Sequence, residues 1–139
     1  MKRKLQSIIL NQDLTTAESD QEVDQILGID PQGVEALLNL RTQSGSLPHT
    51  FEGTYLGLNL STHALYTSYR DCIQILSQLD KERIKKGKKT FTLLDLGAGI
   101  GRLAVTAALF FPHLKVVSVE IVKERLDLAY KALKAVHYE

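Results

Sequence analysis

The sequence predicts an α/β protein in which N-terminal helices precede the first β-α-β-α units of a parallel sheet. Two apolar runs, residues 90–95 and 115–120, have the length of buried strands, and each ends in an acid and is followed by helical spacing. After the first run stand Gly97, Gly99 and Gly101, which allow a tight turn with little side-chain bulk. Strands and helices that alternate in this way form parallel strands joined by right-handed crossovers.

The first half of the chain has helical spacing of apolar residues and no strand alternation. A short helix is expected over residues 2–11. A second helix is expected to be capped by Ser19 or Asp20 and to stop at Gly28, because side-chain oxygens favour N-caps and glycine favours helix ends. Pro31 suits the first position of a third helix, because an N–H at that position has no partner within the helix and proline, which lacks an N–H, loses no hydrogen bond there.

A polar connector over residues 42–48, which includes a Ser-Gly-Ser sequence, predicts a boundary between two regions. Residues 1–48 are expected to form a helical N-terminal region. Residues 49–139 are expected to form the first part of a domain built on the sheet. The helices expected in this second region cover residues 61–79, 101–111 and 122–136.

An acid stands two residues before the first glycine of the turn, at Asp95. A dinucleotide site holds a pyrophosphate against a helix N-terminus, and a fixed carboxylate there opposes it. The dinucleotide fingerprint also needs a glycine where this chain has Arg102. S-adenosylmethionine has no phosphate and carries a sulfonium and an ammonium, so charge and spacing both favour this methyl donor over a nicotinamide cofactor. Glu120, at the end of the second strand, is placed to accept hydrogen bonds from ribose hydroxyls.

The sequence LLDLGAGIG over residues 93–101, followed by VVSVE over residues 116–120, resembles motif I and the next acidic strand end of class I S-adenosylmethionine-dependent methyltransferases. The resemblance implies a Rossmann-like sheet that binds this cofactor and an enzyme that transfers its methyl group. It implies that Asp95 lies near the methionine part of the cofactor and Glu120 binds the adenosine ribose. The turn implied beneath the cofactor consists of Gly97, Ala98, Gly99 and Gly101. The side chain implied beside the adenine is that of Ile121. The alternative is that Asp95 only caps the following helix and the glycines only connect two elements.

The resemblance also implies an incomplete sheet, because a class I methyltransferase has seven strands and two are predicted here. The chain therefore looks truncated and too short to be catalytically complete, and whether it is an enzyme stays open. No catalytic residue can be named. Uncovered sheet surface predicts self-association, packing of the N-terminal helices across it, or a missing C-terminal half. The alternative function is a non-catalytic cofactor-binding or protein-interaction module derived from a methyltransferase.

Further expectations concern the methyl acceptor and the segment before the sheet. The helical N-terminal half followed by Gly-x-Gly-x-Gly resembles the disruptor-of-telomeric-silencing type of lysine methyltransferase, which implies a protein lysine as acceptor. The Tyr-Gly-Glu element of that family is not matched by residues 55–58. In many class I methyltransferases the segment before the sheet folds over the cofactor, which makes Tyr55, Thr62 and Tyr66 candidate contacts. Half-buried packing is the alternative for each tyrosine.

Composition excludes several other classes of protein. With 17 Lys plus Arg against 16 Asp plus Glu, the net charge of +1 gives no whole-chain indication of nucleic acid or a membrane surface. Residues 81–89 hold six basic side chains, which favours a solvated helix end over the alternative of a patch for nucleic acid or an acidic protein. Cys72 is the only cysteine and the histidines are scattered, so no disulfide and no metal site is expected. No apolar run has the length of a membrane span or of a signal peptide, so a cytoplasmic protein is expected.

Overall fold

The computed structural model describes residues 1–43 and 66–137, and the chain divides into two units. Unit 2, Asp30–Leu65, contains α3 (Pro31–Gln43), which begins at Pro31 as the sequence predicts. The Asp30 carboxylate accepts a hydrogen bond from the Gly33 N–H at 3.0 Å and so satisfies a free donor of the first turn. The predicted boundary at residue 48, and the candidates Tyr55 and Thr62, lie outside the described residues.

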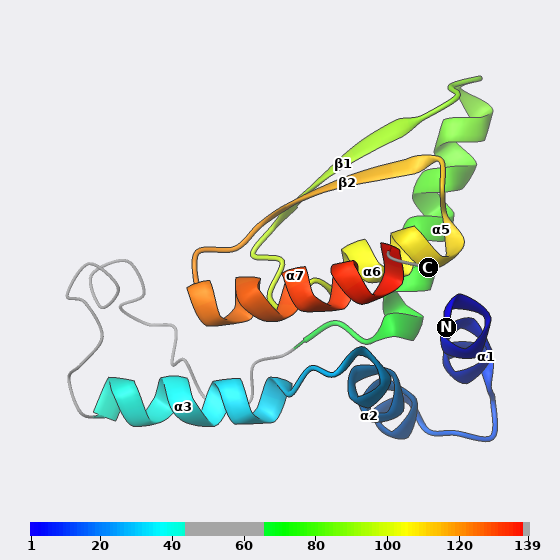
Figure 1. Cartoon of the computed structure of the whole chain (residues 1–139). Helices are drawn as coiled ribbons and strands as arrows, with labels where there is room; N and C mark the ends of the chain where they lie inside the picture. The colour runs from blue at the N-terminus through cyan, green and yellow to red at the C-terminus, as the bar shows by residue number, and fades with distance from the viewer. Residues whose placement is uncertain (44–65, 138–139) are drawn as a thin grey trace. The chain divides into compact units, whose positions relative to one another are not determined.

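Unit 1, Met1–Ile29 with Tyr66–Glu139, contains the sheet and is mixed α/β. The strands β1 (Phe91–Leu96) and β2 (Leu114–Val119) are parallel and pair from Phe91↔Leu114 to Leu96↔Val119 (Figure 1). This arrangement is compatible with an incomplete α/β fold and confirms the predicted alternation of strands and helices at that level. The helices of unit 1 are α1 (Lys2–Leu10), α2 (Thr16–Leu27), α5 (Tyr69–Lys85), α6 (Arg102–Phe110) and α7 (Lys123–His137).

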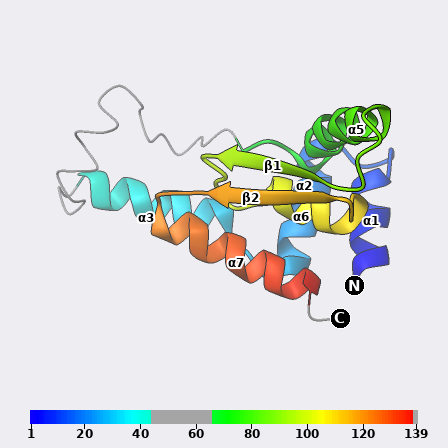
Figure 2. The ribbon, with the colours of Figure 1, turned by 90° about the horizontal axis from the view of Figure 1, so that it is seen from above.

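Described helices cover one face of the sheet, and no described element of unit 1 covers the other. On the covered face, Leu93 and Val116 pack against Leu76 of α5 and Ala107 of α6. On the opposite face, the apolar side chains of both strands are 41 to 73% exposed: Leu94, Leu96, Val117 and Val119. Seen from above in Figure 2, no described helix of unit 1 lies over the strands on that side. The expectation that the N-terminal helices cross the open face is not met by α1 or α2, and self-association stays a prediction.

The N-terminal helices instead pack on the helical layer. A shared core joins α1, α2, α5, α6 and α7 through Leu5, Ile9, Val23, Leu27, Tyr69, Val105, Leu109, Ala132 and Val136. The Arg70 guanidinium donates from Nε to the Ile9 carbonyl at 3.0 Å, which satisfies an acceptor at the end of α1. Gln6 donates to the Leu109 carbonyl at 2.6 Å and ties α1 to α6. Arg102, the first residue of α6, forms ion pairs with Asp20 and Asp24 of α2, so α2 lies beside the first turn of α6, where the predicted site begins.

The start of α2 differs from the prediction. Its N-cap is Thr15, whose hydroxyl accepts from the Glu18 N–H at 3.3 Å while the Glu18 carboxylate accepts from the Thr15 N–H at 2.8 Å. This reciprocal capping box satisfies two free backbone donors, so the helix starts one turn before the predicted caps. Ser19 and Asp20 lie inside the helix and are buried. The predicted end is confirmed, because Gly28 has φ of 68° and closes the helix.

The long helix before the sheet also starts later than predicted. Residues 66–68 are not helical, and α5 begins at Tyr69 after the cap Ser68, whose hydroxyl accepts from the Asp71 N–H at 3.0 Å. The helix continues past residue 79 to Lys85, within residues 81–89, where the basic side chains predict a solvated helix end. The other elements of unit 1 lie within one residue of their predicted bounds, which is the normal fraying of helix and strand ends.

Candidate functional site

The predicted site residues gather where both strands end. Asp95 lies in β1, and Glu120 directly follows β2. Because β1 and β2 are parallel and in register, their carboxyl ends meet at one edge of the sheet. The N–H groups of Gly97 and Ala98 both donate to the Val119 carbonyl, at 2.8 and 3.0 Å, so the glycine turn (residues 97–101) is anchored on the end of β2.

The three glycines of the turn have positive φ values of 77°, 57° and 79°, which disfavour any L side chain. Their surroundings differ. A Cβ on Gly101 would lie 2.8 Å from the Cβ of Ala129, so this glycine lets α6 approach α7 closely. A Cβ on Gly99 would lie 3.1 Å from the ring of Tyr66. A Cβ on Gly97 would meet no atom of the described residues within 4 Å, so these residues leave the turn open there.

Glu120 ties the glycine turn to the start of α7. One carboxylate oxygen accepts from the Gly99 N–H and the other from the Val122 N–H, both at 2.8 Å. A carboxylate has about four lone-pair positions, so each oxygen retains room for one further donor. Ile121 next to it is 55% exposed, whereas Val122 is buried. Glu120 therefore has a structural role that leaves acceptor capacity at the edge of the site.

Asp95 has no structural role of that kind. Its carboxylate accepts no hydrogen bond from a described residue, and α6 has Gly101 as N-cap with no side-chain cap, so Asp95 does not cap the helix. Burial, and then the charge of Glu120, raise the pKa of Asp95 above its ordinary value. Two carboxylates that repel one another form a place where a cationic group is favoured.

Ser118 is a polar side chain at this edge that the sequence analysis did not single out. It pairs with Asp95 in the register of the sheet, and paired residues of parallel strands project from the same face. Its Oγ is buried and has no hydrogen-bond partner among the described residues. A hydroxyl inside an apolar strand, in the sequence VVSVE, is the signal that points to it.

A second group of charges lies beneath the turn, and we call it the Arg102 cluster: Arg102, Asp20, Asp24 and Tyr69. The guanidinium contacts the Asp20 carboxylate at 2.8 Å and the Asp24 carboxylate at 2.6 Å. The Tyr69 hydroxyl donates to Asp24 at 2.8 Å, and its backbone N–H donates to Asp20 at 3.1 Å. The sequence does not predict this cluster, because Asp20 is expected there as a helix cap. Two acids four residues apart beside the apolar Val23 and Leu27 were the available signal.

Burial is the largest single influence on the pKa of Asp20, Tyr69 and Arg102. It raises the pKa of Asp20, which Arg102 opposes, and it raises the pKa of Tyr69 well above the ordinary value, which Asp24 reinforces. For Arg102, burial lowers the pKa but the two carboxylates and Tyr69 outweigh it, so the pKa is raised and the charge is retained. The guanidinium is also 5.8 Å from the ring centre of Tyr66, the residue that covers Gly99. The charge of Arg102 is therefore engaged by α2 and is not free to meet a phosphate.

Other residues in the described part of the chain offer no further chemistry at this edge. Burial raises the pKa of the Cys72 thiol to about 12, which makes it a packing residue rather than a nucleophile. Residues 1–43 and 66–137 contain no group of His, Cys, Asp and Glu able to hold a metal ion. Within those residues, no helix has the length and apolar character to cross a membrane.

Comparisons with known proteins give no relative for this chain. No family model matches it. No curated protein and no solved structure shows significant similarity to it. The resemblance to class I methyltransferases therefore rests on residues 93–101 and 116–120 alone.

Proposed function

We propose that the glycine turn, with Asp95 and Glu120, binds S-adenosylmethionine as the cofactor-binding part of a methyltransferase. The observation that carries the proposal is a pair of mutually repelling carboxylates, Asp95 and Glu120, at a glycine turn where a Cβ on Gly97 would meet no described atom within 4 Å. A dinucleotide is disfavoured, because its pyrophosphate would meet these carboxylates while the guanidinium of Arg102, which directly follows the turn, is already bound to Asp20 and Asp24.

Each residue has a stated part in this proposal. Asp95 attracts the ammonium of the methionine moiety, and the remaining lone pairs of Glu120 accept the ribose hydroxyls. Gly97 allows the cofactor to approach the backbone, and Ile121 supplies an exposed apolar side chain for the adenine. The cofactor supplies an electrophilic methyl group, which passes to a nucleophilic acceptor. A protein lysine is the first acceptor to test.

A non-catalytic module is the second candidate, and one observation favours it. Both oxygens of Glu120 already accept backbone hydrogen bonds from the described residues, so the turn is satisfied without a ligand. A chain of this kind would keep the glycine turn for its stability. A non-catalytic module, whether it binds the cofactor or only another protein, transfers no methyl group, so an assay of methyl transfer distinguishes the two candidates.

Isothermal titration calorimetry with S-adenosylmethionine and with NAD tests the proposal. We expect binding of the methyl donor and none of NAD. The variant Asp95→Asn should weaken binding about tenfold or more, because a charge-assisted hydrogen bond contributes about 1.5 to 3 kcal/mol. Glu82→Gln, an exposed carboxylate of α5, is the matched control and should bind as the wild type does. Equal affinity for both ligands, or no effect of Asp95→Asn, would contradict the proposal.

A further inference from the structure

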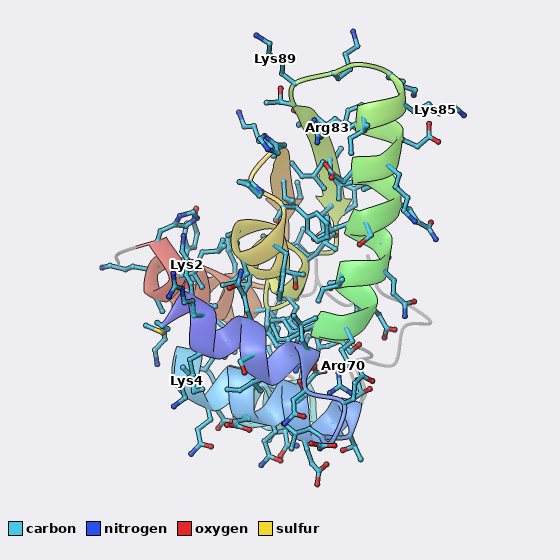
Figure 3. All side chains as sticks on the ribbon, turned by 90° about the vertical axis from the view of Figure 1, so that its right-hand side faces the viewer. Lys2, Lys4, Arg70, Arg83, Lys85 and Lys89 are labelled. Carbon is cyan, nitrogen blue, oxygen red and sulfur yellow. The ribbon has the colours of Figure 1, made fainter. Side chains whose placement is uncertain are left out.

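The end of unit 1 opposite the proposed cofactor site is strongly basic. The C-terminal turn of α5 and the residues before β1 carry Lys85, Lys88 and Lys89, all exposed. Lys115 of β2 is also exposed and pairs with Thr92 at the start of β1. Figure 3 shows Lys85 and Lys89 projecting outward at this end of α5, far from Arg70 at its other end. We call these four lysines the basic end.

The lysines of the basic end are not needed to close α5. Gly87 has φ of 61°, its N–H donates to the Ile84 carbonyl at 2.9 Å, and the Lys88 N–H donates to the Arg83 carbonyl at 3.0 Å. This pair of hydrogen bonds is a Schellman motif, which satisfies the last helical carbonyls through the backbone. Because backbone hydrogen bonds already close the helix, stabilisation of the helix end does not explain why Lys85, Lys88 and Lys89 are gathered here.

Two neighbouring cations do have internal partners, and they hold the basic end in place. Arg83 forms an ion pair with Asp80 at 2.7 Å and donates to the Lys88 carbonyl at 2.9 Å. The Lys86 ammonium lies 5.6 Å from the ring centre of Phe91. The four lysines of the basic end, by contrast, form no ion pair with a described residue. A fixed turn thus presents their charges to solvent.

We infer that the basic end binds the phosphate backbone of a nucleic acid. Unpaired lysines contact phosphates as point charges, without reading sequence. Asp95 and Glu120 lie at the other end of six-residue strands, about 20 Å away at the rise of a strand, so they repel the polyanion only weakly. A membrane surface is disfavoured, because Ile84, 62% exposed, is the only large apolar side chain exposed within the described residues 81–90. The net charge of +1 does not reveal that lysines lie at one end of the strands and the two acids at the other.

Fluorescence anisotropy of a labelled duplex, titrated with the full chain without S-adenosylmethionine, tests the inference independently of cofactor binding. Four phosphate contacts predict a slope of about −3.6 for log K against log salt concentration. The triple variant Lys85→Ala, Lys88→Ala, Lys89→Ala should reduce the magnitude of that slope by about 2.7 and weaken binding at least about tenfold at low salt. The melting temperature of this variant should stay within about 2 °C of the wild type, since surface changes of this kind cost little.

The matched control removes three equally exposed charges from α1: Lys2→Ala, Arg3→Ala, Lys4→Ala. Lys2 and Lys4 lie away from the basic end in Figure 3, so this control should bind the duplex as the wild type does. Three results would overturn the inference: no binding at low salt, equal losses in the two triple variants, or tighter binding to anionic vesicles or polyglutamate than to the duplex.

Discussion

At the scale of single residues, the two acids of the proposed site relate to the fold in opposite ways. Glu120 joins two backbone N–H groups, from Gly99 and Val122, and so holds the turn together. Asp95 accepts no hydrogen bond from a described residue, and its charge opposes that of Glu120. A carboxylate that destabilises the fold and has no structural partner is typical of a ligand-binding site.

The variant Asp95→Asn should stabilise the chain at neutral pH. The pKa of Asp95 is raised in the folded state from 3.8, so the stability that this group contributes is full below about pH 3.8 and is lost as the pH rises through the raised value. Asparagine removes that loss. The melting temperature should rise at pH 7 by up to about 3 °C, a small shift because Asp95 is only half-buried.

The same comparison at about pH 3 is the control, since the carboxylate is then mostly protonated in both states and most of the gain should vanish. Scanning calorimetry of both proteins at the two pH values measures the difference. A melting temperature that falls at pH 7 would show that Asp95 has a stabilising partner.

The variant Glu120→Gln should have the opposite effect on stability. Its amide NH₂ must face either the Gly99 N–H or the Val122 N–H, which loses one hydrogen bond and leaves a donor unpaired. We expect a loss of about 1 to 3 kcal/mol in the free energy of unfolding by urea titration. Glu82→Gln should cost less than about 0.5 kcal/mol. Equal effects of the two substitutions would refute the structural role of Glu120.

At the scale of elements, the glycines of the turn have different roles: Gly101 allows two helices to pack closely, and Gly97 leaves space for the proposed cofactor. Gly101→Ala adds a methyl against Ala129 of α7 in addition to a disfavoured φ, and it should cost about 2 to 5 kcal/mol. Gly97→Ala meets only the φ penalty, about 1 to 2 kcal/mol, because no atom of the described residues lies within 4 Å of the added methyl. Gly97→Ala should nevertheless abolish cofactor binding in calorimetry while the chain stays folded. If it binds as tightly as the wild type, the cofactor does not approach the backbone at this glycine.

Most elements of unit 1 could be predicted from periodicity, because strands β1 and β2 and helices α6 and α7 bury regular apolar faces. The start of α2 could have been predicted from Thr15 and Glu18, whose three-residue spacing is a capping box. The start of α5 at Tyr69 could have been predicted in the same way from Ser68 and Asp71, although the apolar spacing continues through Leu65 in the sequence. The Arg102 cluster depends on the packing of α2 against α6, which no local pattern specifies.

At the scale of the whole of unit 1, the Arg102 cluster connects the N-terminal helices to the proposed site. Arg102→Met should cost about 3 to 5 kcal/mol, because it leaves two buried carboxylates without a cation. The triple variant Arg102→Met, Asp20→Asn, Asp24→Asn should recover more than half of that loss, since no buried charge remains unpaired. Urea unfolding of both variants measures the difference. A triple variant no more stable than the single one would show that the charges themselves are not the cause.

The central claim is that the glycine turn binds S-adenosylmethionine. A ¹H–¹⁵N NMR titration tests it most directly, because the backbone amides of Gly97, Gly99 and Gly101 report on the turn itself. We predict that S-adenosylmethionine shifts these amides, with the largest change at Gly97, and that NAD leaves them unchanged. Unchanged glycine amides at saturating S-adenosylmethionine, or equal shifts with NAD, would contradict the claim.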